Sequence, residues 1–234
     1  MRPAKSVGRI IGMLLFVQLV GLTLAFILLL PITTSGFLEN AAGVSFQIKV
    51  AVFLLFANSA LTIGIAIAAF PIFREYSYRM ALWFLAFSII WFSMQAVDNI
   101  HILSMLSLSQ QYTQGGASNA ELFGALATAV RSTRRWAHYT ELLVIDTWFV
   151  VFYSSLFRFA LVPRVLAGFG LIMVIVHTTG ITLPVFAGYS SVPLMAYSMA
   201  LSYLALGTWL VVKGFEEGHR RLRAEAHEVE LDRG

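Results

Sequence analysis

The stretch VAVFLLFANSALTIGIAIAAF, residues 50–70, decides the fold class of this chain. It contains no charged residue, and its length is close to the ~20 residues that a helix needs to cross ~30 Å of hydrocarbon. A membrane strand would alternate polar and apolar residues, and this stretch does not. We therefore interpret it as a transmembrane helix, in which every backbone polar group is satisfied within the segment.

Five more apolar segments of similar length surround it, at residues 10–30, 80–106, 136–160, 165–187 and 192–212. The sequence thus predicts an all-α, polytopic membrane protein, a bundle of six transmembrane helices. The composition agrees, because 59% of the 234 residues are hydrophobic and only 12% are charged. A soluble domain is typically about half apolar and about a quarter charged. The chain has no cysteine, which excludes disulfides and thiolate metal sites.

The basic residues predict the orientation of the spans. If the N-terminus is cytoplasmic, only four of the 16 lysines and arginines lie outside, namely Lys49, Arg131, Arg134 and Arg135. Because cytoplasmic loops carry an excess of positive charge, we expect both termini inside, N-in and C-in. The transmembrane domain would then span residues 1–214, followed by a charged cytoplasmic tail at 215–234.

One outer loop, residues 107–135, is longer than the other connections. Within it, residues 119–131 are predicted to form a short amphipathic helix at the outer interface, with Ser118 and Glu121 spaced as a capping box.

Ionisable side chains inside the predicted spans point to a site. Such a group costs ~2.5–3.5 kcal/mol at the centre of a membrane helix, so its presence indicates function. Asp98 and His101 are three residues apart, as are His138 and Glu141, so each pair projects from one side of its helix. The predicted orientation places both pairs, and His177, between the midplane and the outer surface. We expect all five to converge on one outward-facing cavity.

Imidazole and carboxylate groups together suit a divalent metal ion such as zinc, iron or manganese. The predicted ligands are Asp98, His101, His138, Glu141 and His177, and the supporting polar residues are Gln95, Asn99, Tyr139 and Asp146. Two other interpretations stay open. The groups could pair with one another, for example Asp98 with His101 or Glu141 with an arginine of the outer loop. They could also bind protons or a small solute.

Several other classes of protein fit poorly. Haem would need two histidines facing each other at matching depth, and the nearest pair, His101 and His138, lies near span ends. No lysine lies in the middle of a span, which argues against a retinal Schiff base. The basic residues sit at span ends, so the formal charge of +4 does not indicate nucleic acid as a partner.

The second half of the chain resembles a known family. The stretches FVVFYSSLFRFALVPRVLAGFGLIMVIVH (149–177) and LALGTWLVVKGF (204–215) are similar to a bacterial family of six-span membrane proteins, domain of unknown function 4386. The positions that carry the resemblance are Arg158, Pro163, Arg164, Gly168, Trp209, Lys213 and Gly214. The resemblance implies six helices in the plasma (inner) membrane of a bacterium, and it assigns no activity or catalytic residue.

Two hypotheses about function follow. One is a membrane-embedded metalloenzyme acting on a lipid or lipid-soluble substrate that enters from the outer leaflet. The other is a non-enzymatic carrier or sensor that binds protons or a small molecule through the same buried residues. The expected partners are the lipid bilayer and a second copy of the chain, with which it could form a homodimer.

Overall fold

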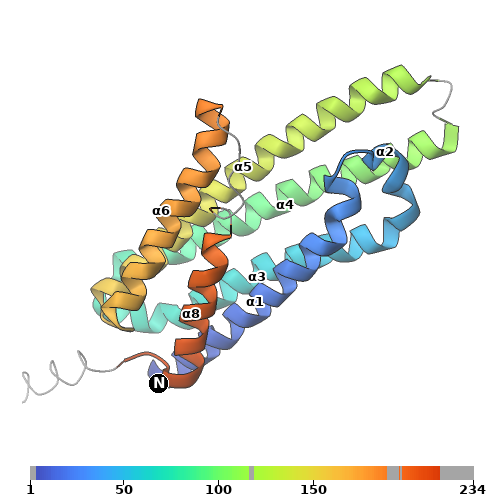
Figure 1. Cartoon of the computed structure of the whole chain (residues 1–234). Coiled ribbons are helices and arrows are strands. Elements are labelled where there is room, and N and C mark those ends of the chain that lie inside the picture. Colours follow the sequence, from blue (N-terminus) through green and yellow to red (C-terminus); the bar gives the residue numbers. More distant parts are fainter. Residues whose placement is uncertain (1–3, 116–118, 189–194, 196, 217–234) are drawn as a thin grey trace, which may run out of the picture. The chain divides into compact units, whose positions relative to one another are not determined.

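The computed structural model describes residues 4–115, 119–188, 195 and 197–216, and all regular structure in these residues is helical (Figure 1). The helices are α1 (Ala4–Thr33), α2 (Phe37–Asn40), η1 (Ala42–Val44), α3 (Ser45–Tyr76), α4 (Tyr78–Gly115), α5 (Ala120–Arg158), α6 (Arg164–Ala187) and α8 (Ser198–Lys213). The prediction of an all-α fold is confirmed.

Five helical segments are long and apolar enough to cross a membrane: α1, α3 together with η1, α4, α5 and α6. Large apolar side chains on their outer faces are exposed, such as Val20 (66%), Phe53 (68%) and Ile175 (66%). In water such surfaces would be aggregation sites, whereas in a bilayer they face lipid. The chain is therefore a polytopic membrane protein. The sixth apolar helix, α8, has only 16 residues, and the start of the span predicted at 192–212 lies outside the described residues.

The segment predicted as an outer loop differs from the expectation. α4 continues to Gly115 and α5 begins at Ala120, so most of residues 107–135 is helical. The amphipathic helix predicted at 119–131 is the first part of α5 rather than a separate element. No glycine or proline separates Arg131 from Trp136, so nothing in the sequence ends the helix there. Ser118 of the capping box and residues 217–234 of the tail lie outside the described part of the chain.

The chain folds as two compact units. The first comprises Met1–Val17, Ile65–Ala86 and Asp146–Gly234, and the second comprises Gln18–Gly64 and Phe87–Ile145.

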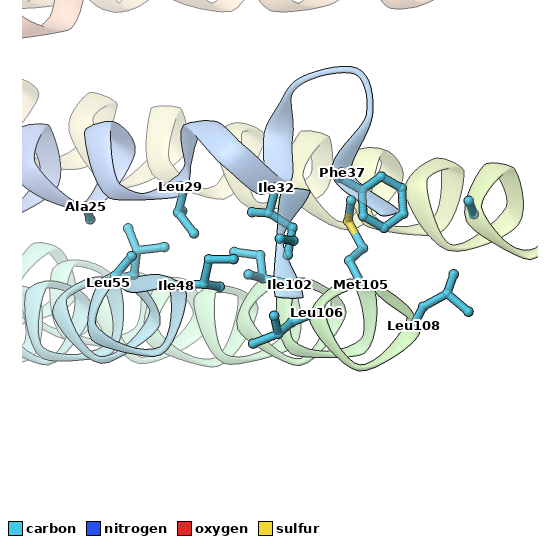
Figure 2. Close-up of a cluster of buried hydrophobic side chains, with 13 residues drawn as sticks. Ala25, Leu29, Ile32, Phe37, Ile48, Leu55, Ile102, Met105, Leu106 and Leu108 are labelled. Atoms are coloured by element: carbon cyan, nitrogen blue, oxygen red, sulfur yellow. The ribbon is translucent and has the colours of Figure 1, made fainter. Parts of the chain in front are cut away.

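The second unit has an aliphatic core. Figure 2 shows Ala25, Leu29 and Ile32 of α1 in one buried cluster with Ile48 of α3 and Ile102 of α4. Polar side chains tie the same helices together.

Gln18 and Ser109 form hydrogen bonds to other elements of this unit. Gln18 of α1 donates to the carbonyl of Asn58 at 3.0 Å and to Thr62 at 2.9 Å. Ser109 of α4 donates to the carbonyl of Leu38 at 2.8 Å and accepts from the backbone N–H of Ala42 at 2.9 Å. Both side chains are buried, so these hydrogen bonds fix how the helices pack.

The first unit has an aromatic core. Phe84 of α4 stacks on Phe152 of α5 with ring centroids 5.0 Å apart, and Trp148 lies 5.0 Å from Phe84. Gly170 of α6 lies so close to Tyr153 of α5 that an added Cβ would be 2.2 Å from its ring. A side chain at position 170 would therefore push α6 away from α5, which agrees with the role of small residues in membrane helix packing.

Candidate functional site

Four polar side chains meet inside the second unit. Asp98 comes from α4, and Arg134, His138 and Glu141 come from α5. Positions 134, 138 and 141 recur every three to four residues, so all three side chains leave α5 on one face. That face is turned toward Asp98.

The distances define a compact cluster centred on His138. Its Nδ1 lies 3.5 Å from Glu141 Oε2 and 3.7 Å from Asp98 Oδ2. On the other side of the carboxylate, Arg134 Nε lies 3.4 Å from Asp98 Oδ1. The weak hydrogen bond from Arg134 Nη2 to Asp98 Oδ2, at 3.5 Å, completes the contacts.

Burial makes these charges costly. The side chains of Asp98 and Glu141 are only 2% and 3% exposed, while that of His138 is 31% exposed. Asp98 Oδ1, Arg134 Nε, His138 Nδ1 and Glu141 Oε2 have no hydrogen-bond partner among the described residues. The four atoms do lie in ion-pair contacts, Arg134 Nε with Asp98 Oδ1 and His138 Nδ1 with Glu141 Oε2, but none of these contacts is a hydrogen bond. Because a buried polar atom without a hydrogen bond costs about 1–3 kcal/mol, the cluster has room for an additional ligand or proton.

The geometry suits a metal ion. One ligand atom each from Asp98, His138 and Glu141 lies within 4.8 Å of the other two. In a tetrahedral zinc site with bonds of 2.0–2.1 Å, ligand atoms are about 3.3 Å apart. The two distances from His138 Nδ1 exceed this value by only a few tenths of an ångström. The separation of the two carboxylate oxygens is within 4.8 Å, so the carboxylates of Asp98 and Glu141 would have to move toward each other to share one ion.

The other residues predicted as ligands or supports lie elsewhere. His101 is half-buried on α4 and is not part of the group that could hold a metal. Gln95 donates to Asn99 at 3.2 Å, and Asn99 donates to the carbonyl of Val52 at 3.4 Å, so this pair ties α4 to α3. The ring of Tyr139 packs against Trp136.

His177 pairs with Asp146 in the first unit. Its Nδ1 lies 2.7 Å from Asp146 Oδ1, and the hydroxyl of Thr178 donates to Asp146 Oδ2 at 2.8 Å. Both Asp146 and His177 are buried. Of the five residues expected in one cavity, the structure thus groups Asp98, His138 and Glu141.

Arg134 is the member of the cluster that the sequence did not assign to the site. One of the open alternatives paired Glu141 with an arginine of the predicted outer loop, whereas the structure places Arg134 against Asp98. The spacing of 134, 138 and 141 could have identified it, because those positions share one helical face.

Comparison with known proteins places the chain in a family. A family model described as Domain of unknown function (DUF4386) matches residues 10–214, nearly the whole chain. The chain belongs to this family. The resemblance seen in the second half of the sequence is thereby confirmed. No curated protein and no solved structure matches the chain. Family membership assigns no activity, so the function of this DUF4386 protein has to be argued from its own residues.

Proposed function

We propose that this DUF4386 protein binds one divalent metal ion through Asp98, His138 and Glu141 and uses it to hydrolyse a lipid or lipid-soluble substrate. The observation that carries the proposal is that a histidine nitrogen and two buried carboxylate oxygens, from two helices, lie within 4.8 Å of one another. Zinc fits this donor set best, and iron or manganese would accept it.

The hydrolytic part of the proposal rests on coordination number and charge. Three protein ligands leave a fourth tetrahedral position for water, which a zinc ion makes acidic. Two carboxylates, one guanidinium and a divalent ion sum to one positive charge when His138 is neutral. A bound hydroxide would bring that sum to zero. Arg134 would thus favour hydroxide, the nucleophile in hydrolysis, over neutral water.

The substrate class follows from the surroundings. The cluster lies in long apolar helices of a membrane protein, where lipids and lipid-soluble molecules are the abundant reactants. His138 is the most exposed of the three ligands and would lie nearest the entry of a substrate.

Metal analysis of purified protein tests the binding step. We expect about one zinc, iron or manganese ion per chain in the wild type, and loss of that ion in His138→Ala and Glu141→Gln. His101→Ala is the matched control, because it removes an imidazole three residues from Asp98 that lies outside the group. If His138→Ala and Glu141→Gln keep the metal as His101→Ala does, or if the wild type takes up none from a zinc-containing buffer, the proposed metal site is wrong.

The ion pair between Arg134 and Asp98 favours a second function. Protonated His138 and Arg134 together would neutralise Asp98 and Glu141 without any metal. In that case the cluster would bind and release a proton, as in a carrier or sensor. Protein that stays metal-free in zinc but takes up about one proton per chain on acidification, with His138→Ala losing that uptake, would support this function.

A further inference from the structure

A lipid-facing groove runs between α6 and α8 in the first unit. It has a volume of about 910 Å³ and is lined mainly by apolar side chains. These include Val165, Leu166 and Phe169 of α6 and Leu204, Trp209 and Val212 of α8. Val165 is 86% exposed and Val212 is 58% exposed, so the groove opens outward.

Positive charge gathers at one end of this groove. α6 begins at Arg164 and α8 ends at Lys213, and Lys213 itself lines the groove. Arg9 reaches the same end, because its Nη2 donates to the carbonyl of Val212 at 3.3 Å. None of these three side chains forms an ion pair with a described residue. Arg164 adjoins the lining residues Pro163 and Val165, and its guanidinium lies 5.9 Å from the centroid of the Phe157 ring, a contact that leaves its charge without a counter-ion. Glu216 lies near this end of the groove, because its backbone N–H donates to the carbonyl of Leu161, two residues before the lining residue Pro163.

Trp209 lies in the wall of the groove. The indole Nε1 of Trp209 is buried and has no hydrogen-bond partner in the described part of the chain. Because this nitrogen is buried rather than exposed in the groove, the ring of Trp209 contributes apolar wall to the groove, and its N–H is not part of the lipid site.

We propose that this groove is a binding site for an anionic phospholipid. One acyl chain lies along the apolar wall, and the phosphate pairs with Lys213 and Arg164. Unpaired cations at the end of an apolar groove between two membrane helices are complementary to a negative headgroup above a hydrocarbon chain. The site lies in the first unit and shares no residue with the Asp98 cluster.

Native mass spectrometry of the full-length protein in neutral detergent tests this site. The probes are phosphatidylglycerol and phosphatidylcholine with identical acyl chains. We expect the wild type to prefer phosphatidylglycerol, and Arg164→Gln with Lys213→Gln to lower that preference about 30-fold, or about fivefold for each charge. Arg74→Gln with Arg79→Gln is the matched control, because it removes two exposed cations of the same unit that lie on α3 and α4, whereas α6 and α8 form the groove.

Ala205→Trp, which fills the groove, should reduce binding of both lipids. Equal binding of the two lipids by the wild type would overturn the proposal. So would an equal loss of preference in the control variant. If the protein is a dimer that Ala205→Trp dissociates, a second copy covers the groove and the lipid site is wrong. A variant is used only if it elutes as one species in size-exclusion chromatography. If a double variant does not, the two corresponding one-residue variants are measured instead.

Discussion

Asp98 contacts two basic groups: Arg134 lies against both carboxylate oxygens, and His138 lies against Oδ2. A metal ion bound at Oδ2 would lie close to the guanidinium. At an effective dielectric constant of about 20, the repulsion between a divalent ion and a guanidinium ~5 Å away amounts to several kcal/mol. Arg134 therefore opposes metal binding while it favours ionisation of metal-bound water.

Replacing Arg134 separates these two effects. We expect Arg134→Gln to tighten zinc binding by about tenfold or more, because it removes the repelling charge. The same variant should lower hydrolysis of a fluorescent acyl-ester substrate. Competition with a zinc-binding dye measures the affinity, and Arg135→Gln, which removes the neighbouring exposed charge, is the control. Weaker zinc binding in Arg134→Gln than in this control would contradict the assigned role.

Thr178 supports the Asp146–His177 pair in the first unit. Removing its hydroxyl with Thr178→Val deprives Asp146 Oδ2 of a hydrogen bond, which is worth about 1.5–3 kcal/mol to a charged group. We expect a melting temperature several degrees lower, with unchanged metal content. Thr179→Val is the matched control, because Thr179 bonds only to the carbonyl of Ile175 in its own helix. Equal shifts in the two variants would show that the bond to Asp146 contributes nothing.

The helices show which structural features the sequence patterns predict and which they do not. Apolar length predicts each long helix, because the bilayer imposes it. The polar run at residues 107–115 looked like a loop, yet α4 continues through it. Its polar side chains bond to other elements: Ser109 to Leu38 and Ala42, and Gln110 to Ser45. Such tertiary hydrogen bonds outweigh the weak helix or loop propensities of single residues, and no local sequence pattern predicts them.

Ser109 provides a test of this explanation. Ser109→Ala should leave the backbone N–H of Ala42 and the carbonyl of Leu38 without this partner in a partly buried place, at a cost of about 1 kcal/mol each. We expect a clear drop in melting temperature and faster hydrogen exchange in α2 and η1. Ser107→Ala is the control, because Ser107 is exposed and bonds only to Leu103 in its own helix. A variant as stable as the control would show that these bonds do not hold α4 to α2.

At the scale of the whole molecule, the sequence predicted a part of the site. Helical spacing alone placed His138 and Glu141 on one face, and Asp98 was assigned to the same depth. The spacing could not tell that His101 lies outside the cluster or that His177 pairs with Asp146. Which helices are neighbours, and how each is rotated, depends on packing between distant segments, and one sequence does not encode this in any local pattern.

The predicted orientation is also a property of the whole chain. Because the protein has no cysteine, single-cysteine variants can be labelled without background. We expect a membrane-impermeant maleimide added to intact cells to label Gly115→Cys, and to label Glu75→Cys and Glu216→Cys only after lysis. Labelling of Glu75→Cys in intact cells would reverse the topology and place the Asp98 cluster in the inner half of the membrane.

The metal centre is tested most directly by anomalous diffraction from zinc-loaded crystals, with data collected above and below the zinc absorption edge. We predict one strong difference peak bonded at about 2.0–2.2 Å to Asp98, His138 and Glu141. The fourth position should hold a water oxygen, and Arg134 should remain beside Asp98 Oδ1. A map without a peak at these residues in protein saturated with zinc, or with its strongest peak at His101, would contradict the proposed site.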